Sequence, residues 1–86
     1  MDPQSRPLLE VTVVTPEGVL FEGNAQSVVL PGTKGTFEIL PHHKPLLSRL
    51  LKGEVSIDGQ PISIQRGVVR VGLNRVVAIV EAAASI

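Results

Sequence analysis

The 86-residue sequence contains no cysteine, tryptophan or tyrosine, and it has only two phenylalanines. Without cysteine, the chain can form neither disulfides nor thiolate metal sites. Acidic and basic residues balance at eight each, so no strong electrostatic field draws the chain towards nucleic acid. The basic residues are scattered, and no aromatic side chains lie between them to stack on bases. We therefore expect no binding to nucleic acid.

Long hydrophobic runs are also absent. No apolar stretch approaches the roughly 20 residues of a membrane span, and residues 1–7 contain no apolar signal core. We expect residues 1–7 to form a flexible N-terminus and residues 8–86 to form one domain. A chain this short buries only about 60–65 % of the surface that its unfolded form exposes, so a permanent partner would add to its stability.

The sequence does contain many aliphatic residues, arranged in short segments. Apolar residues make up 43 % of the chain. Segments rich in β-branched or alternating apolar residues occupy positions 8–14, 19–21, 25–30, 36–40, 54–57, 61–65, 67–71 and 75–81. In the first segment, Leu9, Val11 and Val13 are predicted to lie on one face. Turn residues separate them, with Asp58-Gly59 as the strongest hairpin pattern. This spacing predicts an all-β sandwich or barrel. Residues 45–53 fit either a short helix or a buried irregular strand, and the all-β context favours the strand.

Groups that could carry catalysis are few. His42 and His43 are adjacent, and neighbouring side chains of an extended chain point to opposite sides, so the pair does not suit one metal ion. No Gly-x-Ser-x-Gly segment marks a serine nucleophile, and Gly32 and Gly35 lack the Gly-Lys-Ser/Thr ending of a phosphate-binding loop. We expect no catalytic site, no metal and no cofactor, which favours a binding or structural role by elimination.

Three segments carry a resemblance to a known family. Residues 14–23 read Val-Thr-Pro-Glu-Gly-Val-Leu-Phe-Glu-Gly, residues 28–35 read Val-Val-Leu-Pro-Gly-Thr-Lys-Gly, and residues 39–47 read Ile-Leu-Pro-His-His-Lys-Pro-Leu-Leu. Their order and spacing resemble the N-terminal domain of the ε subunit of F-type ATP synthases, and residues 67–80 resemble its closing hairpin. The resemblance covers nearly everything from Leu9 to Ala83. It implies a flattened antiparallel β-sandwich of about ten short strands.

The resemblance also implies a mechanical role. It places the chain in the central stalk, or rotor, of the ATP synthase, where it would bind the γ subunit and the c-subunit ring. In this position it would couple proton-driven rotation to ATP synthesis without a catalytic site of its own. The complex would hold it at the cytoplasmic side of a bacterial plasma membrane, with no direct insertion into lipid.

The resemblance further suggests contact residues. Four hairpin residues match the loop that faces the c ring, namely Thr33, Lys34, Thr36 and Glu38. Three other positions match residues that lie towards γ, namely Thr15, His43 and Ser48. His42 replaces the glycine that is usual in the family. That replacement matters because a positive φ costs histidine more than glycine.

Family members usually continue into a helical hairpin of about fifty residues, estimated from two helices of ordinary length and a turn. This sequence stops at Ile86. On the resemblance alone, we therefore expect no C-terminal helical domain and no helix-dependent inhibition of ATP hydrolysis.

One alternative class is a lipoyl- or biotinyl-type carrier domain. Such domains are also small and all-β, with a modified lysine at a hairpin tip, where we expect Lys34. However, the neighbours Thr33 and Gly35 differ from the Asp-Lys-Ala or Met-Lys-Met surroundings of such carriers.

A peptide- or sugar-binding sandwich is a third interpretation. It would need exposed aromatic residues, and both phenylalanines, Phe21 and Phe37, fall at predicted strand-core positions.

Overall fold

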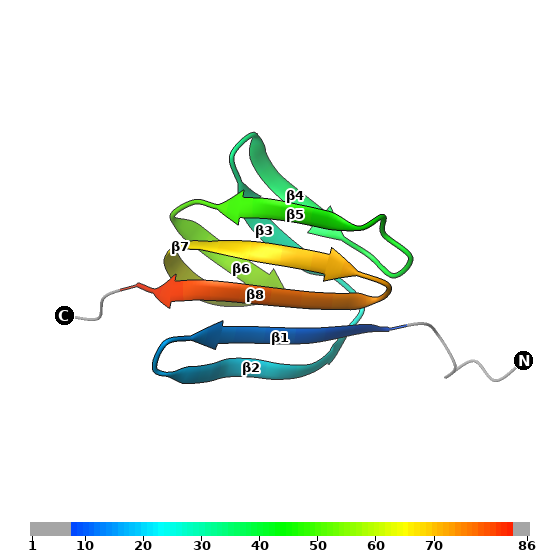
Figure 1. The fold of residues 1–86 in the computed structure, drawn as a ribbon, viewed down its shortest axis with the longest axis horizontal. Helices are drawn as coiled ribbons and strands as arrows, with labels where there is room; N and C mark the ends of the chain where they lie inside the picture. The colour runs from blue at the N-terminus through cyan, green and yellow to red at the C-terminus, as the bar shows by residue number, and fades with distance from the viewer. Residues whose placement is uncertain (1–7, 84–86) are drawn as a thin grey trace, which may run out of the picture.

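The computed structural model describes residues 8–83, which fold into β-strands joined by short connections (Figure 1). The strands are β1 (Leu9–Thr15), β2 (Gly18–Ala25), β3 (Val28–Gly32), β4 (Gly35–Ile39), β5 (Leu46–Leu50), β6 (Gly53–Ile57), β7 (Gln60–Gly72) and β8 (Arg75–Ala82). The all-β prediction is confirmed, and the segment that also fitted a helix is β5. No helix in the described range is long and apolar enough to cross a membrane. The predicted flexible N-terminus, residues 1–7, lies outside the described residues.

The strands form one continuous network that folds into two layers. Neighbouring strands follow the order β2-β1-β8-β7-β5-β3-β4, and β6 pairs with both β3 and β7. In Figure 1, β5, β7 and β8 lie in front of β3 and β6. The long strand β7 links the layers, because residues 60–64 pair with β6 and residues 67–72 pair with β8. The register shifts between Ile64 and Arg66, and such a β-bulge bends a strand.

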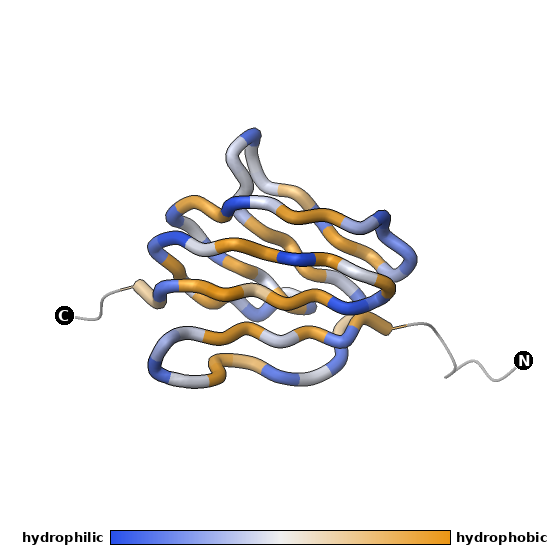
Figure 2. The backbone as a smooth tube through the Cα atoms, viewed as in Figure 1, coloured by the Kyte–Doolittle hydropathy of each residue, from blue (hydrophilic) through white to orange (hydrophobic). Residues whose placement is uncertain are grey.

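The core lies between the layers and is aliphatic. Leu9, Val11 and Val13 of β1 are at most 1 % exposed and alternate with less buried residues, as the sequence pattern predicted. In Figure 2, hydrophobic and hydrophilic residues alternate along β1, whereas β8 is hydrophobic along most of its length. No polar side chain of the described residues is buried, and Phe21 and Phe37 pack partly buried against the core. Fully burying a Val, Leu or Ile side chain stabilises the fold by about 1.5–3 kcal/mol, so this alternation fixes which face of β1 turns inward.

The structure differs from the sequence-based expectation in strand number and in one pairing. It has eight strands, whereas the resemblance implied about ten, and the predicted strands 61–65 and 67–71 are parts of one strand, β7. β2 continues through Gly23, where turn residues separated two predicted strands. The connection between β2 and β3 falls at residues 26–27 instead. In addition, β1 pairs in parallel with β8, whereas the resemblance implied antiparallel strands. The other paired strands are antiparallel.

Candidate partner-binding surfaces

The β3–β4 hairpin is a narrow projection at the top of Figure 1. Gly32 pairs with Gly35, so Thr33 and Lys34 form the turn. Gly35 has φ of 113°, a conformation that L side chains rarely adopt, and glycine provides it without steric cost. A side chain at Gly32 would lie 2.7 Å from the ring of Phe37. The two glycines therefore allow the chain to reverse tightly while Phe37 packs against its base.

The four residues predicted to face the c ring lie together on this hairpin. Thr33 and Lys34 occupy the tip, and Thr36 and Glu38 alternate along β4 with the inward-facing Phe37 and Ile39. All four are exposed. The hydroxyl of Ser27 donates a hydrogen bond to Oε2 of Glu38, at 2.7 Å. The hairpin thus presents hydroxyl groups, one ammonium and one carboxylate on a narrow surface.

Ser48, predicted to lie towards γ, is close to the same hairpin. It is half-buried on β5, and its hydroxyl donates to the carbonyl of Arg49 at 3.1 Å. A shallow hollow beside the hairpin is lined by Ser48 and by Leu46, Phe37 and the residues of the turn. The structure therefore groups Ser48 with the predicted c-ring residues.

Thr15, also predicted to lie towards γ, closes the turn between β1 and β2. Its Oγ1 accepts a hydrogen bond from the backbone N–H of Glu17 and donates one to the carbonyl of Gly18, both at 3.1 Å. A threonine hydroxyl commonly stabilises a turn in this way. Strands β8 and β7 separate β1 from β5, so Thr15 and Ser48 do not form one cluster.

His43, the third residue predicted to lie towards γ, belongs to the loop between β4 and β5. Its backbone N–H donates to the carbonyl of Leu40 at 3.1 Å, which closes a β-turn with Pro41 and His42 at the central positions. His42 has φ of 69°, as expected where histidine replaces glycine. Proline followed by a residue of positive φ is the arrangement of a type II turn.

The ring of His43 and the backbone of His42 each have a defined hydrogen-bond partner. Nδ1 of His43 lies 2.6 Å from the carbonyl oxygen of Lys44, which can only accept, so Nδ1 carries a hydrogen and Nε2 remains available. The N–H of His42 donates to Oδ1 of Asn74 at 2.6 Å. No three His, Asp or Glu side chains gather to hold a metal ion anywhere in residues 8–83.

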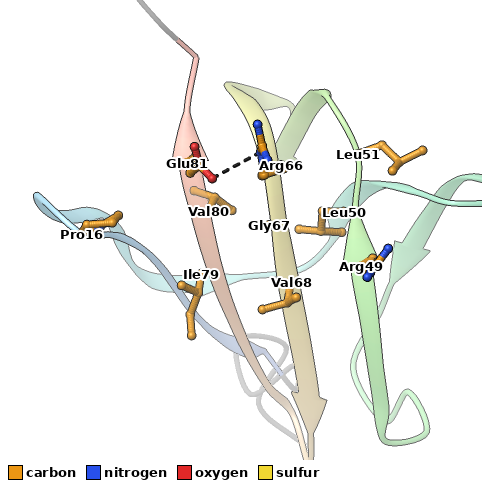
Figure 3. A pocket seen from close by; sticks show the side chains of 10 residues that line it. All are labelled: Pro16, Arg49, Leu50, Leu51, Arg66, Gly67, Val68, Ile79, Val80 and Glu81. Carbon is orange, nitrogen blue, oxygen red and sulfur yellow. Dashed lines mark ion pairs between the residues drawn. The ribbon is translucent and has the colours of Figure 1, made fainter.

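A second surface was missed by sequence reasoning. Outward-facing residues of β5, β7 and β8 surround a shallow hollow of about 510 Å³ (Figure 3). Its apolar lining includes Pro16, Leu51, Val68 and Ile79, with Ile79 54 % exposed. We call these four residues and the hollow they line the apolar hollow.

Charged residues surround the apolar hollow. Arg49, Arg66 and Glu81 lie along it, and Nε of Arg66 is 3.3 Å from Oε2 of Glu81. Figure 3 shows this pair beside Val80 at one end of the hollow. An apolar centre with a charged rim is the usual composition of a protein interface. The sequence did carry a signal, because β7 and β8 place apolar residues on both faces: Val68 and Ile79 are exposed while Val69 and Val80 are buried.

The family comparison matches almost the whole chain. Residues 8–86 match the family described as "ATP synthase, Delta/Epsilon chain, beta-sandwich domain". A protein named ATP synthase epsilon chain from Nitratiruptor sp. is 44 % identical, over 87 % of this chain and 62 % of that protein. Another with that name from Campylobacter fetus is 38 % identical, with the same coverage. The chain therefore spans about three fifths of the length of these curated relatives.

Solved structures show the same fold at lower sequence identity. A chain in the central stalk and c-ring structure of the Tetrahymena thermophila mitochondrial ATP synthase superposes with a TM-score of 0.74 at 19 % identity, over 85 % of this chain and 63 % of that one. A chain of the Euglena gracilis mitochondrial ATP synthase gives a TM-score of 0.73 at 13 % identity, over 100 % of this chain and 57 % of that one. With the family match over residues 8–86, these findings show that the chain belongs to the family of the ATP synthase delta/epsilon chain β-sandwich domain.

Proposed function

We propose that this chain is a non-catalytic central-stalk subunit of a bacterial ATP synthase that binds the γ subunit and the c ring. The observation that carries the proposal is the family match over residues 8–86, together with bacterial relatives that are named ATP synthase epsilon chain. In this role the subunit turns with γ and the ring, and it transmits proton-driven rotation towards ATP synthesis. It lies at the cytoplasmic side of the plasma membrane and is held there by the complex.

The exposed surfaces support a protein that holds permanent partners. The buried core is aliphatic, and the apolar side chains of Val68 and Ile79 lie outside it and are exposed. Exposed apolar patches with polar rims mark interaction surfaces. A partner covering the apolar hollow would also compensate for the small core of a short chain.

The β3–β4 hairpin is the proposed contact with the c ring. Thr33, Lys34, Thr36 and Glu38 supply short polar groups on a narrow projection, which suits contact with polar loops. The proposed γ contacts, Thr15, His43 and Ser48, lie apart. A single partner that reached both Thr15 and His43 would extend across β8 and β7, from the end of the sandwich that carries the apolar hollow to the end that carries the β7–β8 turn.

The first experiment mixes the chain with the matching γ subunit and follows association by size-exclusion light scattering and calorimetry. We expect a tight one-to-one complex. Absence of binding at tens of micromolar, which corresponds to a binding free energy weaker than about −6 kcal/mol, would contradict the proposal.

Intact mass measured on the same sample tests the carrier-domain alternative, because a carrier expressed with its ligase gains a prosthetic group on Lys34.

The second experiment tests the hairpin with two charge reversals of the same kind. Lys34 lies at the hairpin tip and Lys52 lies in the connection between β5 and β6, and both are exposed. We expect Lys34→Glu to weaken association with a purified c ring by about tenfold, or about 1.4 kcal/mol, and Lys52→Glu to leave it unchanged. Equal effects of the two substitutions would show that net charge, not the hairpin, determines the affinity.

A further inference from the structure

Asn74 joins three parts of the molecule that are distant in sequence. It lies in the turn between β7 and β8, and its backbone carbonyl accepts a hydrogen bond from the N–H of Glu10 in β1, at 2.8 Å. Its side-chain Oδ1 accepts the N–H of His42 in the β4–β5 loop, at 2.6 Å. One turn residue therefore connects the first strand, the last hairpin and the loop that carries His43.

The residue that Asn74 holds is in an unfavourable backbone conformation. His42 has φ of 69°, and a non-glycine residue in the left-handed region costs roughly 1–2 kcal/mol. The second central position of a type II turn requires this conformation and normally carries glycine or asparagine. A hydrogen bond from outside the turn can compensate for that cost. Asn74 also has a positive φ, of 50°, which asparagine tolerates better than most residues.

The turn determines where His43 lies. The N–H of His43 closes the turn onto the carbonyl of Leu40, and the ring Nδ1 donates to the carbonyl of Lys44, so both the backbone and the ring of His43 are oriented by groups next to the turn. If His42 left the positive-φ region, the chain direction after it would change and His43 would move. The position of Nε2 therefore depends on a side chain that contacts His42 rather than His43.

We propose that Asn74 is a positioning residue that holds the His42–His43 turn in the conformation that binds the partner. This inference rests on the proposed function, in which His43 contacts γ. Asn74 acts through the backbone of His42 and need not touch the partner. Glycine at position 42 would adopt a positive φ without support, whereas His42 is held in this conformation by its long-range hydrogen bond to Asn74.

The first test needs no partner. Amide hydrogen exchange, measured by NMR on the 86-residue chain, compares the wild type with Asn74→Ala, Asn74→Asp and Leu73→Ala. We expect the His42 amide to exchange about tenfold faster in Asn74→Ala, and to stay slow in Asn74→Asp, which keeps an acceptor oxygen. Leu73→Ala is the control, because Leu73 is the neighbouring turn residue and is 86 % exposed. Unchanged exchange of His42 in Asn74→Ala would overturn the proposal.

The second test measures binding to γ by calorimetry in two backgrounds. We expect Asn74→Ala to weaken binding about tenfold in the wild-type background, and to have little effect when position 42 carries the His42→Gly substitution. Glycine adopts a positive φ without support, so it rescues a positioning defect but not a general loss of stability. Equal losses in the two backgrounds would overturn the proposal.

The two tests separate this inference from the proposed function. If the wild-type chain does not bind γ, the proposed function fails. Hydrogen exchange of His42 then still decides whether Asn74 holds the turn.

Discussion

Two regions of the molecule hold their turns by different means. The first is the end of the sandwich that contains Asn74, and the second is the β3–β4 hairpin. At the first, side chains cross between turns: Asn74 binds the β4–β5 loop, and the carboxylate of Asp58 accepts hydrogen bonds from the N–H groups of Gln26 and Ser27 at 3.0 Å. At the hairpin, backbone pairing between Gly32 and Gly35 closes the turn. Neither Thr33 nor Lys34 uses its side chain to bond another described residue.

This difference implies different roles for the side chains of the two regions. Those that link turns stabilise the fold, and those at the hairpin tip are available for a partner. Side-chain links between turns fix loops relative to one another, and removing such a link leaves backbone N–H groups without their partner. A hairpin closed by its backbone leaves its tip side chains available, so they can change with little effect on the fold. Substitutions at the two regions should therefore differ in what they disturb, and the following predictions test that comparison from the largest effect to the smallest.

The largest effect on stability is expected at Asp58. We expect Asp58→Ala to lower the free energy of unfolding by about 1–3 kcal/mol, because the N–H groups of Gln26 and Ser27 lose their acceptor. Alanine also tolerates the φ of 48° at this position less well than aspartate. Urea denaturation measures the change, and Asp58→Asn, which keeps one acceptor oxygen, should lose less. An unchanged denaturation midpoint for Asp58→Ala would show that water replaces the carboxylate without cost.

An intermediate effect is expected at Gly35, which tests the backbone of the hairpin. No heavy atom lies within 4 Å of a side chain added there, so the cost of Gly35→Ala comes from its φ of 113° alone. We expect a loss of about 1 kcal/mol in urea denaturation. Gly72→Ala is the matched control, because a side chain there also meets empty space but needs no positive φ. Equal stabilities of the two variants would mean that the hairpin turn adjusts without strain.

The smallest effect on stability is expected at the hairpin tip. We expect Thr33→Ala and Lys34→Ala each to change the free energy of unfolding by less than about 0.5 kcal/mol, because both side chains are exposed. Thermal denaturation followed by circular dichroism measures this. A marked destabilisation by either substitution would show that the tip side chains support the fold, and the contrast with Asp58 would be lost.

Local patterns in the sequence were sufficient to predict most of the fold. Alternating apolar residues predicted the inward face of β1, and Asp58-Gly59 predicted the β6–β7 hairpin. The structure shows why that pair is so informative. Both residues have positive φ, 48° and 86°, as a type I′ turn requires, and few residue pairs adopt this conformation easily.

Features that depend on distant contacts were not predictable in this way. The segments 61–65 and 67–71 were predicted as two strands, yet they form one strand, β7, and Gly67 lies within it. A side chain at Gly67 would lie 2.6 Å from the carbonyl oxygen of Ile79 on β8. The glycine allows close approach between strands instead of ending one. The parallel pairing of β1 with β8 also has no local pattern, because the two strands lie at opposite ends of the described chain.

The candidate contact residues show the same limit. The four predicted c-ring residues are close in sequence and therefore lie on one exposed hairpin. The resemblance and the structure consequently place them in the same group. The link between His42 and Asn74 spans 32 residues, and nothing around either residue indicates it. Apolar residues on both faces of β8 are a signal for the apolar hollow. The sequence does not show which of these residues face outward, because that depends on how β8 is placed in the sheet.

The parallel pairing of β1 with β8 has a consequence for how the chain folds during synthesis. β1 can form its hairpin with β2 early, since the two are adjacent, but residues 10–14 must wait for residues 75–79 to leave the ribosome. At about 5–20 residues per second, the edge of β1 that pairs with β8 stays unpaired for several seconds. Contacts between residues so far apart in sequence also form slowly, because they close a long loop. The β1–β2 hairpin is therefore the part of this domain most in need of protection from aggregation before β8 is available.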